Sequence, residues 1–432
     1  MQKSINNQIN RQKLASLLED KSLCLLFSND KMQRTGDQYF PFRQNSNFYY
    51  MSGIEYPNSI LAICPQHPNP KFREILFVEQ KTQKEIIRDG CAYTKESLRE
   101  ISGIQTVLWL SDFETILQEL MYHAQTVYID IEEHIKFKPD VKPRGFRYAN
   151  NIKSEYPLHS YCPVFQTIAD MRLVKSAYEI EQIKKACEIT AKAFERAIQC
   201  VKPNVYEYEI AAEITYEINK NGAVCAFNPI VAAGKNACTL HYVDNRSMCK
   251  DGDLVLLDFG AEYANYASDL SRTIPVNGRF TARQKQVYDA CFRVYEYAKA
   301  LFFPSMSINK VQKKVNAVMQ EELINLGLFS QTDLEKQSSE YELMKKYFTH
   351  GISHFVGLDV HDVGTKDTVF EEGMILSCEP GIYIPEEEIG IRIETMMLVS
   401  RIPVDLMGEI SAFSEEIETI CSDVQIIKIK EK

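Results

Sequence analysis

The chain has 432 residues, of which 45% are hydrophobic and 25% are charged. This balance is typical of a folded globular protein with two or three domains, and it excludes a disordered chain or a membrane protein. The formal net charge of −10 argues against nucleic acid as a partner. The polar first residues contain no apolar core of a secretion signal, so we expect a cytoplasmic protein that does not bind membranes. Its 12 scattered cysteines, with no C-x-x-C pair, predict buried reduced thiols.

The first third of the chain alternates short apolar runs with polar helical stretches. Strands are expected at Leu23–Phe27, Ser59–Cys64, Ile75–Val78 and Thr126–Ile131. Helices are expected at Ser97–Ile101 and Ser111–Met121. The aromatic segment FRQNSNFYYMSG, residues 42–53, predicts a core strand followed by a turn. Strands interleaved with helices indicate an α/β domain.

A long helix is expected to separate this domain from the rest of the chain. Apolar residues recur at spacings of three and four between Met171 and Cys200, and Pro203 prevents this helix from continuing. A second helix carries a stripe of isoleucines and ends at Gly222. We therefore expect one domain over residues 1–169 and another over residues 170–432.

The second domain is predicted to be α+β. Apolar or alternating runs predict strands at Leu254–Phe259, Leu270–Val276, Met374–Glu379 and Ile389–Val399. Two helical stretches, at about 281–302 and 307–326, lie between them. Several of the polar residues in this part of the chain fall on these strands.

Two aspartates interrupt the apolar strands. Asp258 closes the run Leu-Val-Leu-Leu, and Asp269 stands at the start of the next strand. A two-residue turn at Tyr263-Ala264 would place the aspartates directly opposite each other, with Cβ atoms about 5 Å apart. Carboxylates that close repel each other unless a cation lies between them. Aspartates at the edges of turns are nevertheless common, so this pair alone decides nothing.

A second polar cluster follows towards the C-terminus. Glu379 ends its strand before an expected turn at Pro380-Gly381, and Glu394 shares one face of its strand with Arg392 because side chains alternate. The segment HGISHFVGLDVHD supplies His350, His354 and His361.

Four carboxylates and one histidine at strand ends together predict a metal site. Their negative charge requires about two divalent cations. Oxygen-rich ligands with one imidazole suit Mn²⁺ best, with Zn²⁺, Co²⁺ or Fe²⁺ as alternatives. Two such ions, ~3.5–4 Å apart, can hold a hydroxide and polarise a carbonyl. No phosphate-binding loop, nucleophile elbow or Cys-His signature competes with this interpretation. The spacing alone favours a hydrolase no more than it favours other functions.

Four separated motifs decide between these functions. The segments DFG…SDLSRT, HGISHFVGLDVHDVG, SCEPGIYIP and GIRIE resemble the motifs of the pita-bread metallopeptidases, in that family's order. Within the family the chain resembles the Xaa-Pro aminopeptidase, or aminopeptidase P, branch. FRQNSNFYYMSGIEYPNSIL is similar to the N-terminal domain of that branch, and RLVKSAYEIEQIKKACEIT to the first helix of its catalytic domain. The resemblance covers nearly the whole chain, although residues 396–421 follow it only loosely.

The resemblance implies a role for each residue of the site. Its metal ligands would be Asp258, Asp269, His354, Glu379 and Glu394. Asp258 would bind one ion only, whereas Asp269 and Glu394 would bridge two. Catalytic contacts to the substrate would come from His361, at the scissile carbonyl, and from His241. The supporting residues around the substrate would be His350, Arg392 and Tyr383.

The implied activity removes the N-terminal residue from peptides whose second residue is proline. A hydroxide held between the two metal ions would attack the carbonyl carbon before proline, and Glu379 would pass the proton to the leaving nitrogen. The resemblance also implies a homo-oligomer, either a dimer or a tetramer. Two alternatives stay open: a prolidase that cleaves only Xaa-Pro dipeptides, and a metal-free relative that only binds peptides.

Overall fold

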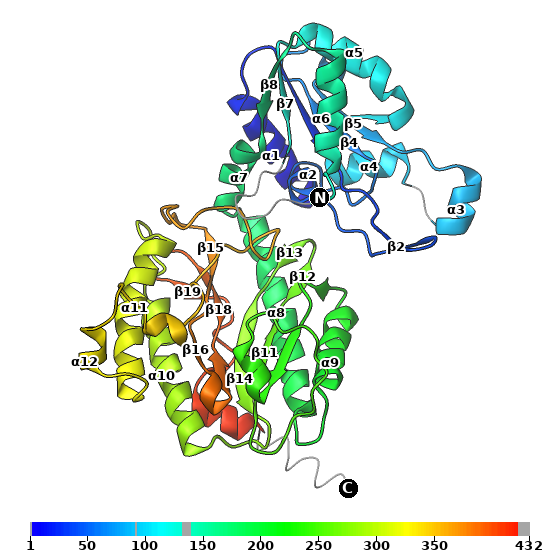
Figure 1. The fold of residues 1–432 in the computed structure, drawn as a ribbon. Helices are drawn as coiled ribbons and strands as arrows, with labels where there is room; N and C mark the ends of the chain where they lie inside the picture. The colour runs from blue at the N-terminus through cyan, green and yellow to red at the C-terminus, as the bar shows by residue number, and fades with distance from the viewer. Residues whose placement is uncertain (1, 91–92, 132–139, 422–432) are drawn as a thin grey trace. The chain divides into compact units, whose positions relative to one another are not determined.

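The structure is a computed structural model that describes residues 2–90, 93–131 and 140–421. The chain divides into two compact units, Met1–Met171 and Arg172–Lys432 (Figure 1). Among the residues that the structure describes, no helix is both long and apolar enough to cross a membrane.

One mixed sheet forms the centre of the first unit, with strand order β6-β5-β4-β1-β7-β8. Its central strand β1 pairs antiparallel with β4 and parallel with β7. Every residue of β1 is buried, as expected for a strand covered on both faces. The strands are β1 (Ser22–Phe27), β4 (Ile60–Ile63), β5 (Glu74–Val78), β6 (Thr106–Trp109), β7 (Thr126–Ile129) and β8 (Ser160–Pro163).

Helices and one small hairpin complete this unit. The helices are α1 (Gln2–Leu17), α2 (Ser46–Ser52), α3 (Gln83–Asp89), α4 (Lys95–Ser102), α5 (Phe113–His123), α6 (Arg144–Glu155) and α7 (Phe165–Leu173). The hairpin pairs β2 (Gln33–Thr35) with β3 (Gln38–Tyr39). Helix α5 packs its apolar face, including Phe113 and Leu117, into the core beneath the sheet.

The aromatic segment 42–53 corrects one expectation, because it forms helix α2 and not a strand. The side chain of Asn45 caps the helix by accepting a hydrogen bond from the Phe48 amide at 2.9 Å. Gly53 ends the helix in the left-handed conformation, with φ of 68°. The aromatic side chains of this helix, Phe48, Tyr49 and Tyr50, are buried as expected, but they lie on a helix and not on a strand.

Two pairs of helices flank the strands of the second unit (Figure 1). Helices α8 (Ala177–Cys200) and α9 (Glu207–Lys220) form one pair, and α10 (Ala282–Lys299) and α11 (Ile308–Asn325) form the other. The helix that was expected to start at Met171 instead starts at Ala177, after a break that separates α8 from α7. Ser176 and Glu179 form a capping box, in which each side chain accepts a hydrogen bond from the other residue's amide, and α8 begins there.

The strands of this unit form several short sheets. One contains β10 (Ile230–Ala233), β11 (Leu254–Phe259) and β14 (Leu270–Pro275), and another contains β9 (Val224–Cys225), β12 (Ala261–Tyr263) and β13 (Tyr266–Ala267). The later strands are β15 (Ile375–Cys378), β16 (Gly381–Ile384), β17 (Ile389–Arg392), β18 (Thr395–Leu398) and β19 (Val404–Asp405), with a short helix α12 (Gln331–Leu334) before them.

The last long strands form an antiparallel ribbon with an interruption in each side. β15 pairs with β18 and β16 pairs with β17, so the expected single strand Ile389–Val399 is divided in two. Gly381 begins β16, so the expected turn at Pro380-Gly381 is also wrong. The pairing keeps one register across the interruption, since Cys378 lies opposite Thr395 and Gly381 lies opposite Arg392. The interruptions, Glu379-Pro380 and Ile393-Glu394, therefore face each other.

Candidate active site

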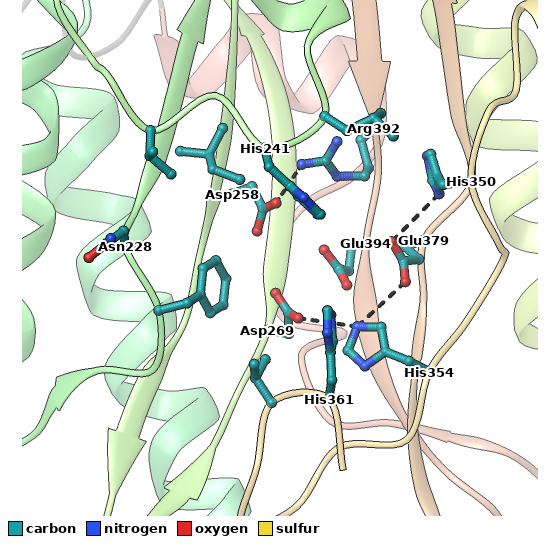
Figure 2. Close-up of a pocket in the computed structure, with 15 residues that line it drawn as sticks. Asn228, His241, Asp258, Asp269, His350, His354, His361, Glu379, Arg392 and Glu394 are labelled. Atoms are coloured by element: carbon teal, nitrogen blue, oxygen red, sulfur yellow. Dashed lines mark hydrogen bonds and ion pairs between the residues drawn. The ribbon is translucent and has the colours of Figure 1, made fainter. Parts of the chain in front are cut away.

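A cavity of about 310 Å³ opens in the second unit, and it brings together nearly all of the predicted site residues (Figure 2). They come from strand ends, from the histidine-rich loop before β15 and, for His241, from the connection between β10 and β11. The predicted residues that line the cavity are His241, Asp258, Asp269, His350, His354, His361, Glu379, Arg392 and Glu394. Tyr383 is the exception, because it lies behind the cavity wall and is only 2% exposed.

The two aspartates share a face of the sheet, but not in the expected register. Asp258 lies opposite Ser271, so the prediction that it directly opposes Asp269 is wrong. The turn falls at Ala264-Asn265, one residue later than expected, and both residues have positive φ. Asp269 precedes Ser271 by two residues, so it points to the same side as Asp258 from a diagonal position.

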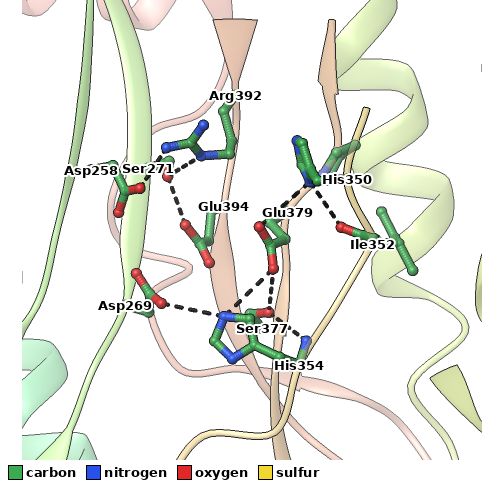
Figure 3. A network of polar contacts seen from close by, with 12 residues as sticks. Asp258, Asp269, Ser271, His350, Ile352, His354, Ser377, Glu379, Arg392 and Glu394 are labelled. Carbon is green, nitrogen blue, oxygen red and sulfur yellow. Dashed lines mark hydrogen bonds and ion pairs between the residues drawn. The ribbon is translucent and has the colours of Figure 1, made fainter. Parts of the chain in front are cut away.

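Two serines that the sequence analysis missed hold the glutamates. The Ser377 hydroxyl donates to Glu379 Oε1 at 3.1 Å and accepts a hydrogen bond from the His354 amide (Figure 3). The Ser271 hydroxyl donates to Glu394 Oε2 at 2.6 Å. Each serine lies two residues from an acidic site residue in the sequence, so the strand period could have identified both.

The imidazole of His354 is oriented as a metal ligand would be. Its Nδ1 lies 3.1 Å from the carbonyl oxygen of Phe355, which fixes the proton on that nitrogen. Its Nε2 lies 3.4 Å from Asp269 Oδ2 and 3.5 Å from Glu379 Oε1. Burial alone would lower the pKa of His354, but the contact with Asp269 and the charge of Glu379 raise it to about 9.

Positive charge within the protein compensates the carboxylates only in part. Burial raises the pKa of Asp258 to about 7, against the opposing effect of Arg392 and with added repulsion from Asp269. Burial, followed by the charges of Asp269 and Glu379, raises the pKa of Glu394 well above its usual value. These shifts show that the folded chain disfavours ionisation of this cluster when no cation is present.

The donor set fits divalent cations. Within the described residues, Oδ1 of Asp258 and Oδ1 of Asp269 are buried without a hydrogen-bond partner. Ligand atoms of Asp269, His354 and Glu394 all lie within 4.8 Å of one another. Buried carboxylate oxygens with unused lone pairs, beside a correctly oriented imidazole, are what a metal ion of the Mn²⁺ or Zn²⁺ type binds.

A chain of hydrogen bonds supports the cavity from behind. Arg392 donates from Nη2 to Asp258 Oδ2 at 2.5 Å and from Nη1 to the Tyr383 hydroxyl at 2.9 Å. That hydroxyl lies 2.8 Å from His350 Nε2. Because arginine can only donate, the tyrosine proton is available to His350, which favours a neutral imidazole with its proton on Nδ1. Burial also lowers the pKa of His350. Tyr383 therefore positions its neighbours and does not line the substrate space.

His361 lies against His354, with 4.3 Å between the ring centroids of the two residues. Burial, followed by the charge of His354, lowers the pKa of His361, so its ring is neutral near pH 7. The neighbouring Asp362 side chain is buried and accepts from Arg172 at 2.5 Å and from Lys175 at 2.9 Å. This ion-pair cluster anchors the loop that carries His361. In the part of the chain that the structure describes, the loop forms no regular strand and pairs with β15 only through an isolated bridge between Phe355 and Leu376.

The sequence of the chain matches known families in both units. Residues 181–401 match metallopeptidase family M24, and residues 8–128 match the aminopeptidase P N-terminal domain. The chain belongs to metallopeptidase family M24. It is 33% identical to Xaa-Pro aminopeptidase of Escherichia coli strain K12, and the match covers 96% of each chain. It is 30% identical to human Xaa-Pro aminopeptidase 3, over 96% of this chain and 85% of the human protein.

Solved structures of the family agree with this assignment. Zinc-substituted E. coli aminopeptidase P in complex with product superimposes with a TM-score of 0.88, at 31% identity and over 98% of both chains. The resemblance to the Xaa-Pro aminopeptidase branch is therefore confirmed. The expected architecture, an α/β N-terminal domain with an α+β pita-bread catalytic domain, is confirmed as well. The named relatives support a peptidase that uses divalent metal ions.

Proposed function

We propose that this protein is an Xaa-Pro aminopeptidase, which releases the N-terminal residue from peptides that carry proline at the second position. The observation that carries the proposal is the cavity in which four carboxylates and four histidines meet. The named relatives are Xaa-Pro aminopeptidases, and the chain matches most of the length of each. This favours the aminopeptidase activity over that of a dipeptide-specific prolidase. The presence of all five ligand-type residues speaks against a metal-free peptide-binding module.

We propose two divalent cations at this site, Mn²⁺ by preference, with Zn²⁺, Co²⁺ or Fe²⁺ as substitutes. The residues that would hold them are Asp258, Asp269, His354, Glu379 and Glu394. Such ions supply Lewis acidity and make a bound water nucleophilic at neutral pH. Four carboxylates carry four negative charges, and one Arg392 contact offsets only a part of that charge.

Glu379 is placed to move the proton in the reaction. Its Oε1 accepts from Ser377, and its Oε2 lies 3.7 Å from His350 Nδ1, so both oxygens are held towards the cavity. We assign it as the base that accepts the proton of the attacking water. It then gives that proton to the proline nitrogen, which carries no hydrogen in the peptide and needs one to leave.

The histidines bind and orient the substrate. His361 is neutral and retains an N–H, so it can donate a hydrogen bond to the scissile carbonyl oxygen as charge develops there. His241 lines the cavity and can contact the substrate from another side (Figure 2). Arg392 acts through Asp258 and Tyr383, because three of its nitrogens already donate within the protein.

A comparison of three peptide classes tests this function. Metal-free protein, reloaded separately with Mn²⁺, Zn²⁺, Co²⁺ or Fe²⁺, would be assayed on Xaa-Pro-Yaa, Xaa-Pro and Xaa-Ala-Yaa peptides. We expect about two ions per chain at full activity and release of the first residue from Xaa-Pro-Yaa. Preference for the dipeptide would make the protein a prolidase. Failure to cleave any peptide with the ions bound would refute the proposal.

Two further properties belong to the same proposal. We propose that the protein acts in the cytoplasm and as a homo-oligomer, either a dimer or a tetramer. Subcellular fractionation of the native cells tests the location. Sedimentation of the purified full chain at several concentrations tests the assembly, and a monomer at every concentration would refute it.

A further inference from the structure

A second group of potential metal ligands lies in the first unit, which contributes none of the residues that line the cavity described above. His67, Glu119 and His123 each offer one ligand atom, and these atoms lie within 4.8 Å of one another. His67 follows strand β4 in a loop. Glu119 and His123 stand one turn apart at the end of helix α5, so their side chains share one face.

The separations within this cluster suit a shared cation better than direct hydrogen bonds. Glu119 Oε1 lies 3.8 Å from His67 Nε2 and 3.6 Å from His123 Nε2. Both distances exceed the usual length of a hydrogen bond. Around a tetrahedral ion with metal–ligand bonds of about 2.0–2.2 Å, neighbouring ligand atoms lie roughly 3.3–3.6 Å apart. The two distances from Glu119 thus lie within a few tenths of an ångström of this range.

The environment of His67 gives the strongest evidence that this cluster binds a metal ion. It is only 1% exposed, and its Nε2 has no hydrogen-bond partner within the described residues. A buried polar atom left in this state destabilises the fold. Its Nδ1 accepts from the Asn69 amide at 3.1 Å and lies 3.2 Å from the Asn69 carbonyl oxygen. A cation at Nε2 requires the tautomer in which Nδ1 carries the proton and donates it to that carbonyl oxygen.

We propose that His67, Glu119 and His123 bind a divalent transition-metal ion of the Zn²⁺ class, with water completing the shell. Two imidazoles and one carboxylate are typical zinc ligands, whereas Mg²⁺ and Ca²⁺ prefer oxygen alone. The side chains of Glu119 and His123 are 49% and 30% exposed, which gives the ion a route from solvent. The bound ion links the loop after β4 to the end of α5 and stabilises the first unit.

Zinc binding to the full-length protein tests this site directly. Zn²⁺ per chain would be measured by equilibrium dialysis and elemental analysis for the wild type, Glu119→Gln and His123→Gln. Glu114→Gln is the matched control, because it removes an exposed carboxylate from the same helix without touching the cluster. His67 is left unchanged, since replacing so buried a side chain could unfold the unit.

We expect Glu119→Gln and His123→Gln each to lose about one tightly bound Zn²⁺, with affinity at this site falling at least about tenfold. Glu114→Gln should bind as the wild type does. Both cluster variants should also lose the Zn²⁺-dependent rise in the melting temperature of the first unit and keep their peptidase rate. Equal Zn²⁺ content and affinity in all four proteins would overturn the proposal, whatever the outcome of the peptide assays.

Discussion

Replacing Glu394 with glutamine should change the stability of the second unit in opposite directions with and without metal ions. Burial and the neighbouring carboxylates raise the pKa of Glu394 in the metal-free fold. A carboxyl whose pKa is raised by folding destabilises the folded state as pH rises above its unfolded pKa, and this effect is complete above the folded pKa. Glutamine can still accept the hydrogen bond from Ser271. The metal-free variant should therefore melt above the wild type at neutral pH, with the difference vanishing below about pH 4.

The metal-bound protein should respond in the opposite sense. At a metal concentration 100 times the dissociation constant, binding stabilises the fold by about 2.7 kcal/mol. If loss of one shared ligand weakens binding about a hundredfold, the same concentration contributes only about 0.4 kcal/mol. For a unit of this size, 1 kcal/mol corresponds to roughly 2–4 °C. The metal-induced rise in melting temperature should thus fall from about 5–10 °C to about 1 °C.

Calorimetry with and without Mn²⁺, at pH 4 and pH 7.5, measures both effects on one preparation. Glu322→Gln is the control, because it removes a carboxylate that pairs with Arg293 at 2.6 Å outside the cavity. It should lower the melting temperature slightly in both states and leave the metal-induced rise unchanged. A full metal-induced rise in Glu394→Gln would refute the assignment of Glu394 as a ligand.

Three further substitutions test other parts of the site. His361→Ala should keep its metal content but lose about 10²–10³-fold in kcat, with little change in KM. A normal kcat with a lower melting temperature would make His361 a packing residue. Tyr383→Phe removes the hydroxyl between Arg392 and His350, which costs about 1–3 kcal/mol. It should slow kcat about 5–160-fold with metal still bound, and an unchanged rate would contradict the positioning role. Asp362→Ala leaves buried Lys175 without its carboxylate partner and Arg172 with Asp359 as its remaining ion-pair partner. It should lower the free energy of unfolding by about 3–5 kcal/mol in denaturant titrations, so a loss under 1 kcal/mol would argue against the anchor.

The sequence predicted the strongly periodic elements best. Strands such as Leu254–Phe259 agree with β11 because a continuous apolar run matches a strand buried on both faces. The turn that follows was placed one residue too early. Ala264-Asn265 lacks the glycine that usually marks such a turn, although both residues adopt positive φ. The shift moved the predicted partner of Asp258 from Ser271 to Asp269.

The division of the last ribbon could not be predicted from its own pattern. Apolar and polar side chains alternate from Ile389 through the interruption at Ile393-Glu394, as they would in one unbroken strand. The interruption lies opposite Pro380, which has no N–H to donate across the ribbon, although its carbonyl oxygen still accepts from the Ile393 amide at 3.2 Å. The Glu394 amide, on the other edge of its strand, donates to the Ser271 carbonyl oxygen on β14 at 3.0 Å. Both partners belong to other segments of the chain, so the pattern of residues 389–399 alone does not reveal them.

Hydrogen-bond donors fixed by the fold explain how the chain can hold so many carboxylates in one cavity. Three of them direct one oxygen to a donor fixed by the fold: Asp258 to Arg392, Glu394 to Ser271, and Glu379 to Ser377. These contacts orient the side chains before any ion binds, so little conformational entropy remains to be lost on binding. They do not neutralise the cluster, because only one of the three donors is charged. The fold therefore supplies the geometry and leaves a deficit of positive charge, and divalent cations are the species that fill it.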